Sequence, residues 1–250
     1  EGKLILDAPG TFHLEGVRFI AGGGLVNVEG KGNLHGIRVA ALDLALKGSY
    51  VQIVYPDGFR GRYDLDLALT QNERGGVLSG DVNLIRGVYS KDFKIERSLL
   101  SLGREEDLAE TAGASEEEAG LLSSTKLNLA IRADENLWII NDFAKLEGRA
   151  NLHVGGTVGE PQITGRVSAF EDSIIKFRQV EYQVTHGNID LVDLDRFNPY
   201  FDISGEARVQ DYDITMKIGG SLEHVELDLS SNPPLSQQDI VALLVTGRTL

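Results

Sequence analysis

Apolar and polar residues alternate with a period of two along most of the chain. In residues 64–70, Leu65, Leu67 and Leu69 are separated by polar or small residues. Because successive side chains of a β-strand point to opposite faces, this segment predicts a strand with one apolar face. The same alternation recurs at these apolar positions: Leu42, Leu44 and Leu46; Val51, Ile53 and Tyr55; Leu127, Leu129 and Ile131; Tyr212, Ile214, Met216 and Ile218; and Val225, Leu227 and Leu229.

Short glycine-containing segments separate these predicted strands, as at residues 55–61, 72–76 and 186–188. Turns of this length join antiparallel neighbours. Residues 154–163 also resemble residues 218–227 in a shared Gly-Gly-hydroxyl-apolar core, as expected of a sheet that grows by repeated hairpins. We therefore expect an all-β fold with a mostly antiparallel sheet and a continuous strip of apolar side chains on one face.

Residues 101–124 interrupt the alternation, because this stretch is acidic and rich in alanine. Such a composition buries little apolar surface and predicts a mobile acidic insert between strands. The alternative is an acidic lid with a function of its own. In either case we expect a single elongated domain over residues 1–250.

The apolar strip needs a cover, and two arrangements provide one. In the first, the sheet folds over so that its apolar faces meet as a sandwich or a closed barrel. In the second, the sheet curls into a trough whose interior receives an apolar ligand. The pattern of the residues leaves both open.

Residues 235–247 carry the one helical pattern. Ser236 is a strong N-cap, and Gly247 supplies the left-handed residue that ends a helix. At this length the helix is too short to cover a broad sheet, but it can close one end of the apolar strip. The side chains expected to dock on the strip form one apolar stripe: Ile240, Leu243 and Leu244.

The charge of the chain argues against nucleic-acid partners. The sequence has 24 Lys and Arg against 38 Asp and Glu, a formal net charge of −14, which repels phosphate backbones. With no cysteine, the chain has no disulfide or thiolate chemistry and tolerates a reducing or an oxidising compartment. No apolar run approaches the ~20 residues of a membrane-spanning helix. The chain does not begin with Met, so we expect it to be part of a longer protein.

No residue pattern predicts catalysis, a metal or a cofactor. The aspartates at 190, 193 and 195 lack the glycine and the final glutamate of a calcium-binding loop, which favours outward-facing strand carboxylates. The sequence has neither a Gly-x-Ser-x-Gly elbow nor a phosphate-binding loop. The histidines lie far apart, as expected of solvated strand and turn residues rather than metal ligands: His13, His35, His153, His186 and His224. We therefore expect a protein that is not an enzyme.

Three motifs carry a resemblance to a known family. They are GTVGEPQITG (156–165), NPYFDI (198–203) and SNPPLSQQDI (231–240). Together they resemble the carboxyl-terminal domain of the TamB family, the translocation and assembly module proteins of the AsmA-like group. The resemblance covers residues 125–248, and residues 1–100 share only the alternation of apolar and polar residues that is typical of strands.

The resemblance implies a long sheet curled into an apolar groove, a "β-taco", in a protein of a Gram-negative envelope. Family members are anchored in the inner membrane and extend across the periplasm. They are implicated in moving phospholipid between the two membranes and in outer-membrane protein assembly and translocation with an outer-membrane barrel partner. The family's extreme carboxyl end continues past the helix toward that partner, beyond Leu250.

This implication favours the trough, in which phospholipid acyl chains contact one face of the sheet. The alternatives are that the same side chains pack against each other, or that exposed sheet edges form a docking platform for strands of other proteins. The residues expected to line the groove are Leu65, Leu67, Leu69, Leu127, Leu129, Ile131, Leu152, Val154, Tyr212, Ile214, Met216, Ile218, Val225, Leu227 and Leu229.

Overall fold

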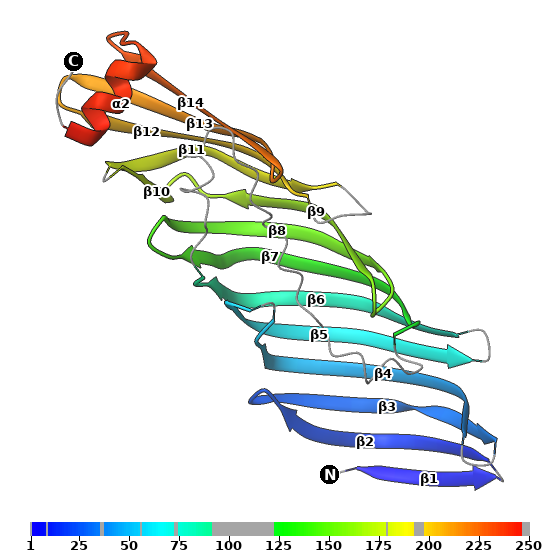
Figure 1. The fold of residues 1–250 in the computed structure, drawn as a ribbon. Helices are drawn as coiled ribbons and strands as arrows, with labels where there is room; N and C mark the ends of the chain where they lie inside the picture. Colours follow the sequence, from blue (N-terminus) through cyan, green and yellow to red (C-terminus); the bar gives the residue numbers. More distant parts are fainter. Residues whose placement is uncertain are drawn as a thin grey trace.

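The computed structural model shows one large sheet with a helix against one end (Figure 1). The residues that the structure describes are 2–8, 10–35, 38–55, 57–72, 75–91, 123–178, 180–192 and 198–246. Of the expected acidic insert, only Ser123 and Ser124 are described, in a turn before the next strand. The prediction of a mobile insert therefore lies outside the described residues.

The sheet is 14-stranded, and most of its strands follow one another in chain order. The strands are β1 (Lys3–Ala8), β2 (Thr11–Ala21), β3 (Gly24–His35), β4 (Arg38–Ile53), β5 (Phe59–Asn72), β6 (Gly75–Tyr89), β7 (Lys126–Ile140), β8 (Ala144–Gly156), β9 (Pro161–Ala169), β10 (Ile174–Phe177), β11 (Val180–Leu191), β12 (Tyr200–Val209), β13 (Tyr212–Ser221) and β14 (His224–Asn232).

Neighbouring strands are antiparallel except for β6 and β7, which are parallel. The helix in the described residues is α2 (Gln237–Thr246), at the C-terminal end. The prediction of an all-β fold with a curled, mostly antiparallel sheet and one short C-terminal helix is confirmed. The parallel pair was not predicted. Its two strands lie on either side of residues 101–124, where the alternation stops and gives no signal for how the strands pair.

Strands β9 and β10 share one position in the sheet, between β8 and β11. β9 pairs with the second half of β8, whereas β10 pairs with its first residues, Ala144 and Lys145. The break between them is fixed by Ser173, whose hydroxyl accepts from the Glu147 N–H and donates to the Glu147 carbonyl, both at 3.1 Å. The two segments therefore act as one interrupted strand.

The register places the alternating apolar residues of all strands on one face of the sheet, the apolar face. Directly opposite residues point to the same side, and the pairs include Leu44 with Leu69 and Ile131 with Leu152. The apolar face begins at Leu4 on β1, which lies opposite Leu14. The other side, the polar face, carries most of the charged residues of the strands.

A β-bulge in β4 keeps two sets of apolar residues on the same face. Gly48 lies opposite Leu65 and Val51 opposite Tyr63, with a register shift between them. Simple alternation would put positions 48 and 51 on opposite faces, but the extra residue of the bulge returns Val51 to the apolar face. Tyr50, within the shift, has a φ of 56°. The predicted third member of this set, Tyr55, lies beyond the end of β4 and is exposed.

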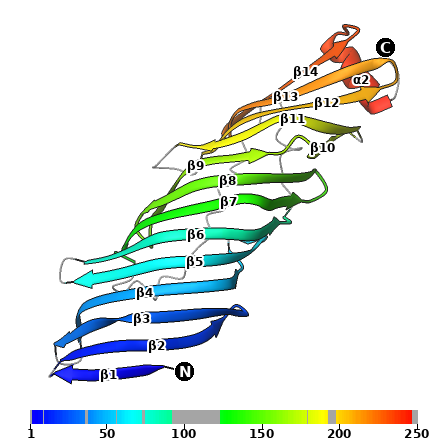
Figure 2. The same ribbon diagram turned by 180° about the vertical axis from the view of Figure 1, so that it is seen from behind.

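The helix lies on the apolar face and not on the polar face. It stands in front of β12–β14 in Figure 1 and behind them in the reverse view of Figure 2. The predicted N-cap is confirmed, because the Ser236 hydroxyl oxygen accepts from the Asp239 N–H at 3.2 Å and donates to its carboxylate at 2.6 Å. The Gln237 side chain also donates to Asp228 of β14 at 3.2 Å. The predicted stop at Gly247 lies outside the described residues.

Candidate functional site

All the residues expected to line a groove lie on the apolar face. The register carries the face from β5 to β8 through pairs such as Leu69 with Leu78 and Leu78 with Leu127. It reaches the last strands through Ile203 with Ile218 and Met216 with Leu229. The structure thus brings together side chains that are far apart in the sequence, although their contact with lipid stays a prediction.

The apolar face has a closed end under α2. Ile214 and Met216 are 0% and 1% exposed, and Ile240 and Leu243 of the helix are equally buried. These residues belong to one cluster, the closed-end cluster, in which strands β10, β11, β13 and β14 meet the helix. Its buried members are Ile175, Phe177, Tyr182, Val184, Ile214, Met216, Ile218, Leu229, Ile240, Leu243 and Leu244. Tyr212, Val225 and Leu227 are half-buried against it.

This burial divides the residues expected to line the groove into two groups, those inside the closed-end cluster and those outside it. Ile214, Met216, Ile218 and Leu229 belong to the closed-end cluster and are buried beneath the helix. Part of the apolar strip is thus packed within the protein. The sequence pattern did not separate these residues from the rest, because the same alternation occurs in strands that have no helix above them.

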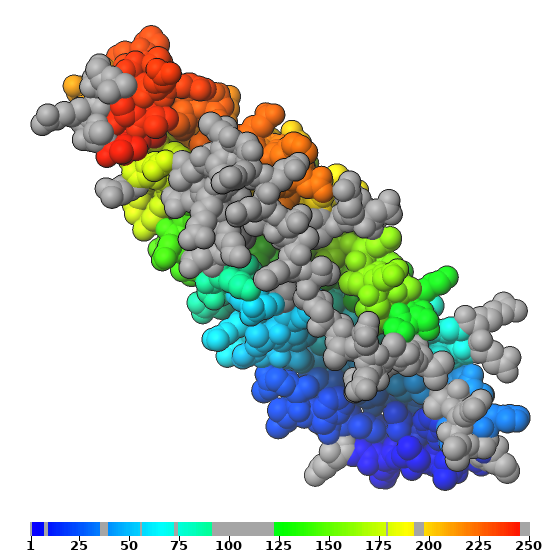
Figure 3. Space-filling view, in the orientation of Figure 1, coloured from blue at the N-terminus to red at the C-terminus, as the bar shows by residue number. Residues whose placement is uncertain are grey.

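The remaining expected residues form the open segment of the apolar face. They are Leu65, Leu67, Leu69, Leu127, Leu129, Ile131, Leu152 and Val154, of which Val154 is buried and the others half-buried. In the part of the chain that the structure describes, α2 is the one element outside the sheet, and it packs over the last strands. Side chains of β2–β5 are visible on this face in Figure 3.

A second buried cluster forms within the sheet itself at its N-terminal end. Val26, Val28 and Val51 are buried there, packed against half-buried neighbours that include Leu44 and Leu46. These residues lie on adjacent strands of the same face, and no described helix covers them. A curled sheet brings side chains of one face together, so they bury each other without a second layer.

Glycines on the apolar face leave room for the curl. Gly80 lies opposite Leu67 with a φ of 136°, and a Cβ there would lie 2.1 Å from the Asp66 carbonyl oxygen. Gly165 lies opposite Leu152 with a φ of 127°, and its Cβ would lie 2.2 Å from the Asn151 carbonyl. Only glycine tolerates such an approach, and glycine kinks give sheets their curvature. Sequence reasoning missed these positions, although glycine inside a strand pattern was the available signal.

The polar face is crossed by ion pairs between neighbouring strands. Lys47 contacts Asp66 at 3.6 Å and Arg132 contacts Asp81 at 3.0 Å. The strongest pair is bidentate, because Arg166 donates twice to Asp190, at 2.5 and 2.9 Å. These hydrogen bonds lower the pKa of the Asp190 carboxyl. Asp190 is therefore an outward strand carboxylate as expected, and residues 193 and 195 lie outside the described residues.

Two histidines have carboxylate partners that the sequence did not indicate. His13 contacts Asp7 at 2.6 Å and Glu15 at 3.3 Å, and its hydrogen bond to Asp7 raises its pKa. His186 contacts Asp202 at 3.2 Å. Asp7 and Asp202 each lie on a strand next to that of their histidine, so the sequence alone could not bring these partners together, whereas Glu15 lies two residues from His13 on β2.

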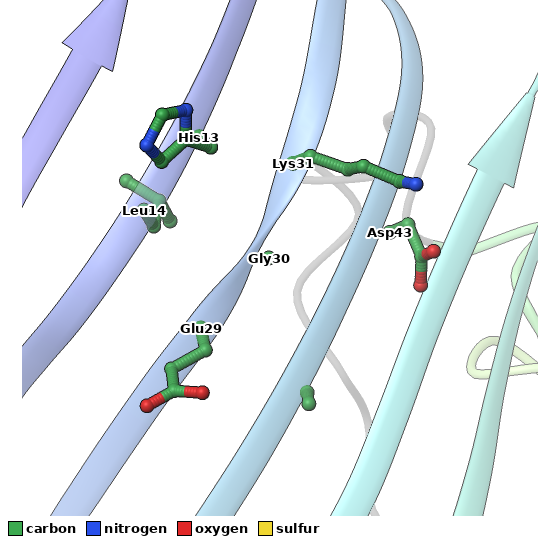
Figure 4. Close-up of a pocket in the computed structure, with 7 residues that line it drawn as sticks. His13, Leu14, Glu29, Gly30, Lys31 and Asp43 are labelled. Atoms are coloured by element: carbon green, nitrogen blue, oxygen red, sulfur yellow. The ribbon is translucent and has the colours of Figure 1, made fainter.

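A shallow hollow of about 450 Å³ lies beside His13. Its charged side chains come from β2, β3 and β4. Figure 4 shows His13, Lys31 and Asp43 on these three strands. Lys31 lies opposite both His13 and Asp43 in the register. Among the described residues, no group of three or more His, Asp or Glu is arranged to hold a metal ion.

None of the helices in the described residues has the length and hydropathy needed to cross a membrane. The comparison with curated proteins found no significant match. The family model of the TamB C-terminal domain matches residues 15–250, nearly the whole chain. This match extends over the N-terminal strands from Glu15 of β2 onward, where the sequence resemblance reached only the alternation of apolar and polar residues. The chain therefore belongs to the TamB family, in which it forms the C-terminal domain.

Proposed function

We propose that this domain carries phospholipid acyl chains along the open segment of its apolar face, between the inner and outer membranes. Family membership supports a role in envelope biogenesis or translocation in a Gram-negative bacterium. The finer proposal depends on one observation: half-buried aliphatic side chains run across β5–β8 without a described element above them. The proposed location is the periplasm, with the full-length protein anchored in the inner membrane.

An aliphatic face suits this task because an acyl chain is a flexible apolar rod. Each buried CH₂ group contributes about 0.8 kcal/mol, whichever of the similar aliphatic side chains it contacts. Many weak contacts let a chain slide from one leucine to the next without a specific binding site. The head group stays in water, so the transfer needs no catalytic residue and no cofactor. The family is not known to be enzymatic.

The position of α2 determines which residues take part. Leu67, Leu129 and Ile131 lie on the open segment and contact the acyl chain directly in this proposal. Ile214 and Met216 contact it only when α2 leaves the apolar face, since both are buried beneath the helix. In this proposal, the part of the apolar face that an acyl chain contacts ends where α2 covers the last strands.

Photocrosslinking in cells labelled with radioactive phosphate tests the proposal. A photoreactive residue at Leu129 faces the open segment, and one at Asn128 on the exposed polar face is the matched control. We expect lipid adducts at position 129 and none at position 128. Equal labelling of the two positions, or no adduct at either in a folded protein, contradicts the conduit.

A charge on the open segment gives a functional test. Leu129→Asp sets a carboxylate in the path, which costs several kcal/mol for each acyl chain that passes it. We expect lipid transfer to stop in this variant, whereas Asn128→Asp leaves it unchanged. Transfer of labelled phospholipid between donor and acceptor vesicles measures the difference, with circular dichroism to show that both variants are folded.

A second candidate function is a docking platform for strands of an outer-membrane client or barrel partner. The observation in its favour is that, in the described residues, β1 pairs with β2 alone and β14 with β13 alone. On β1, Leu4 and Leu6 are 62% and 67% exposed. An edge of this kind accepts an added strand through backbone hydrogen bonds. Ile5→Pro weakens such pairing, so an unchanged yield of assembled outer-membrane protein argues against this edge.

A further inference from the structure

Three arginines gather on the polar face at one end of strands β5 and β6. Arg62 lies directly opposite Arg86, and Arg60 lies opposite Val88. Gln52 of β4 lies opposite Arg62 on its other side. Together with Gly61, these residues line a hollow of about 240 Å³ on the surface.

The arginines have no carboxylate partner among the described residues. The next carboxylate on the same face of β5 is Asp64, which accepts a hydrogen bond from the Tyr50 N–H at 3.0 Å. Asp57, which precedes β5, is paired with Lys91 at 2.7 Å. The carboxylates near this end of β5 are therefore bound to other groups.

The cluster differs from three arginines of the polar face that have partners. Arg132, Arg166 and Arg208 each form an ion pair with an aspartate of a neighbouring strand, at 3.0, 2.5 and 3.1 Å. The whole chain has a formal net charge of −14, so carboxylates are in excess. With this excess of carboxylates, a group of three arginines that have no carboxylate partner among the described residues is unexpected.

Placing two arginines directly opposite each other is unfavourable, because like charges on paired positions repel. An anion in the hollow removes that repulsion by contacting both guanidinium groups. Guanidinium groups match phosphate oxygens especially well, since their N–H donors form two parallel hydrogen bonds. The Gln52 amide adds a further donor, and the hollow is several times the ~30 Å³ that a water molecule occupies.

We propose that Arg60, Arg62 and Arg86 form a binding site for a phosphate group. The phosphate belongs either to an anionic lipid head group or to free inorganic phosphate, since the recognition chemistry is the same. This site goes beyond the proposed function, because it lies on the face opposite the open segment and needs no acyl chain.

Two ligands separate the sources. Inorganic phosphate is titrated against the protein by ³¹P nuclear magnetic resonance. Vesicles of phosphatidylcholine, alone or mixed with phosphatidylglycerol, are tested by flotation. The variants are the double substitution Arg62→Gln with Arg86→Gln and, as matched control, Arg132→Gln, which removes an exposed arginine that already has a partner. The double variant should keep its fold, because it removes a like-charge pair.

We expect the parent and Arg132→Gln to bind phosphate alike, and the double variant to bind about tenfold more weakly. Binding of phosphatidylglycerol vesicles without binding of inorganic phosphate identifies a head-group site. The reverse identifies a site for free phosphate, and binding of both shows a site open to either source.

Three results overturn the proposal. The first is that the parent binds neither ligand. The second is that the double variant binds as well as the parent. The third is that Arg132→Gln loses as much binding as the double variant. That result would show that binding depends on the net charge of the protein and not on this cluster. Melting temperatures of all variants show whether a loss comes from unfolding, and lipid crosslinking at Leu129 tests the conduit independently of this site.

Discussion

The two ends of the apolar face share a sequence pattern but differ in environment. Ile214 in β13 and Leu67 in β5 both alternate with polar residues, yet Ile214 is fully buried and Leu67 is half-buried. The difference comes from α2, which packs over the last strands and over none of the first. Alternation therefore predicts which face a side chain takes, whereas its burial depends on what lies above the sheet.

The largest effect is expected from breaking the contact of the helix. Leu243→Asp removes a fully buried side chain and forces a carboxylate against the closed-end cluster, so unfolding should become easier by about 4 kcal/mol. Val245→Asp is the control, since Val245 lies on the same helix and is 58% exposed. Urea unfolding measures both. Equal stability of the two variants would show that the helix does not hold the cluster.

A matched pair of truncations compares the two environments directly. Ile214→Ala leaves a cavity under the helix and should cost about 3 kcal/mol, whereas Leu67→Ala on the open segment should cost about 1 kcal/mol. The free energy of unfolding from denaturant titration is the readout. A cost for Leu67→Ala as large as that for Ile214→Ala would mean that the open segment is as tightly packed as the closed end.

Removing one hydroxyl should stabilise the closed end. The Tyr182 hydroxyl is buried in the closed-end cluster and has no hydrogen-bond partner among the described residues, and burial raises its pKa to about 12. An unpaired buried hydroxyl costs free energy, so Tyr182→Phe should raise the stability by about 1 kcal/mol. Differential scanning calorimetry detects the change. A lower melting temperature for Tyr182→Phe would indicate a hydrogen bond that forms in solution.

The smallest effect concerns pH at the other end of the sheet. The hydrogen bond to Asp7 raises the pKa of His13 above 6.5, so the charged imidazole stabilises the pairing of β1 with β2. This contribution is complete below pH 6.5 and disappears as the pH rises through the raised pKa. Amide exchange in β1, corrected for its intrinsic pH dependence, should therefore show less protection at alkaline pH. His13→Gln should remove that dependence, and a dependence that persists would exclude His13 as its source.

The face of each strand could be predicted from the sequence because alternation is a local property. Leu65, Leu67 and Leu69 took the expected side, and the cap at Ser236 was readable from the residue type. The family was readable from motifs in residues 125–248, a region that the family model also matches.

The remaining features depend on residues that are distant in sequence. The bulge at Tyr50 is visible only once β4 is paired with β5. The joint between β9 and β10 depends on Ser173 reaching Glu147 in another strand. The arginine cluster likewise arises from the register that sets Arg62 against Arg86. Each of these is fixed by strand pairing, which a periodic pattern does not specify.

The parallel pairing of β6 with β7 has a consequence for how the chain folds. On each side of this pair, most strands contact the strand just before or after them, so only short stretches of chain must close to form them. The β6–β7 pair instead joins segments separated by the residues between Tyr89 and Lys126. Contacts between distant segments form slowly, so we expect two hairpin arrays to nucleate separately. The seam between β6 and β7 would then close last, and in single-molecule pulling it would mark the boundary between two unfolding steps.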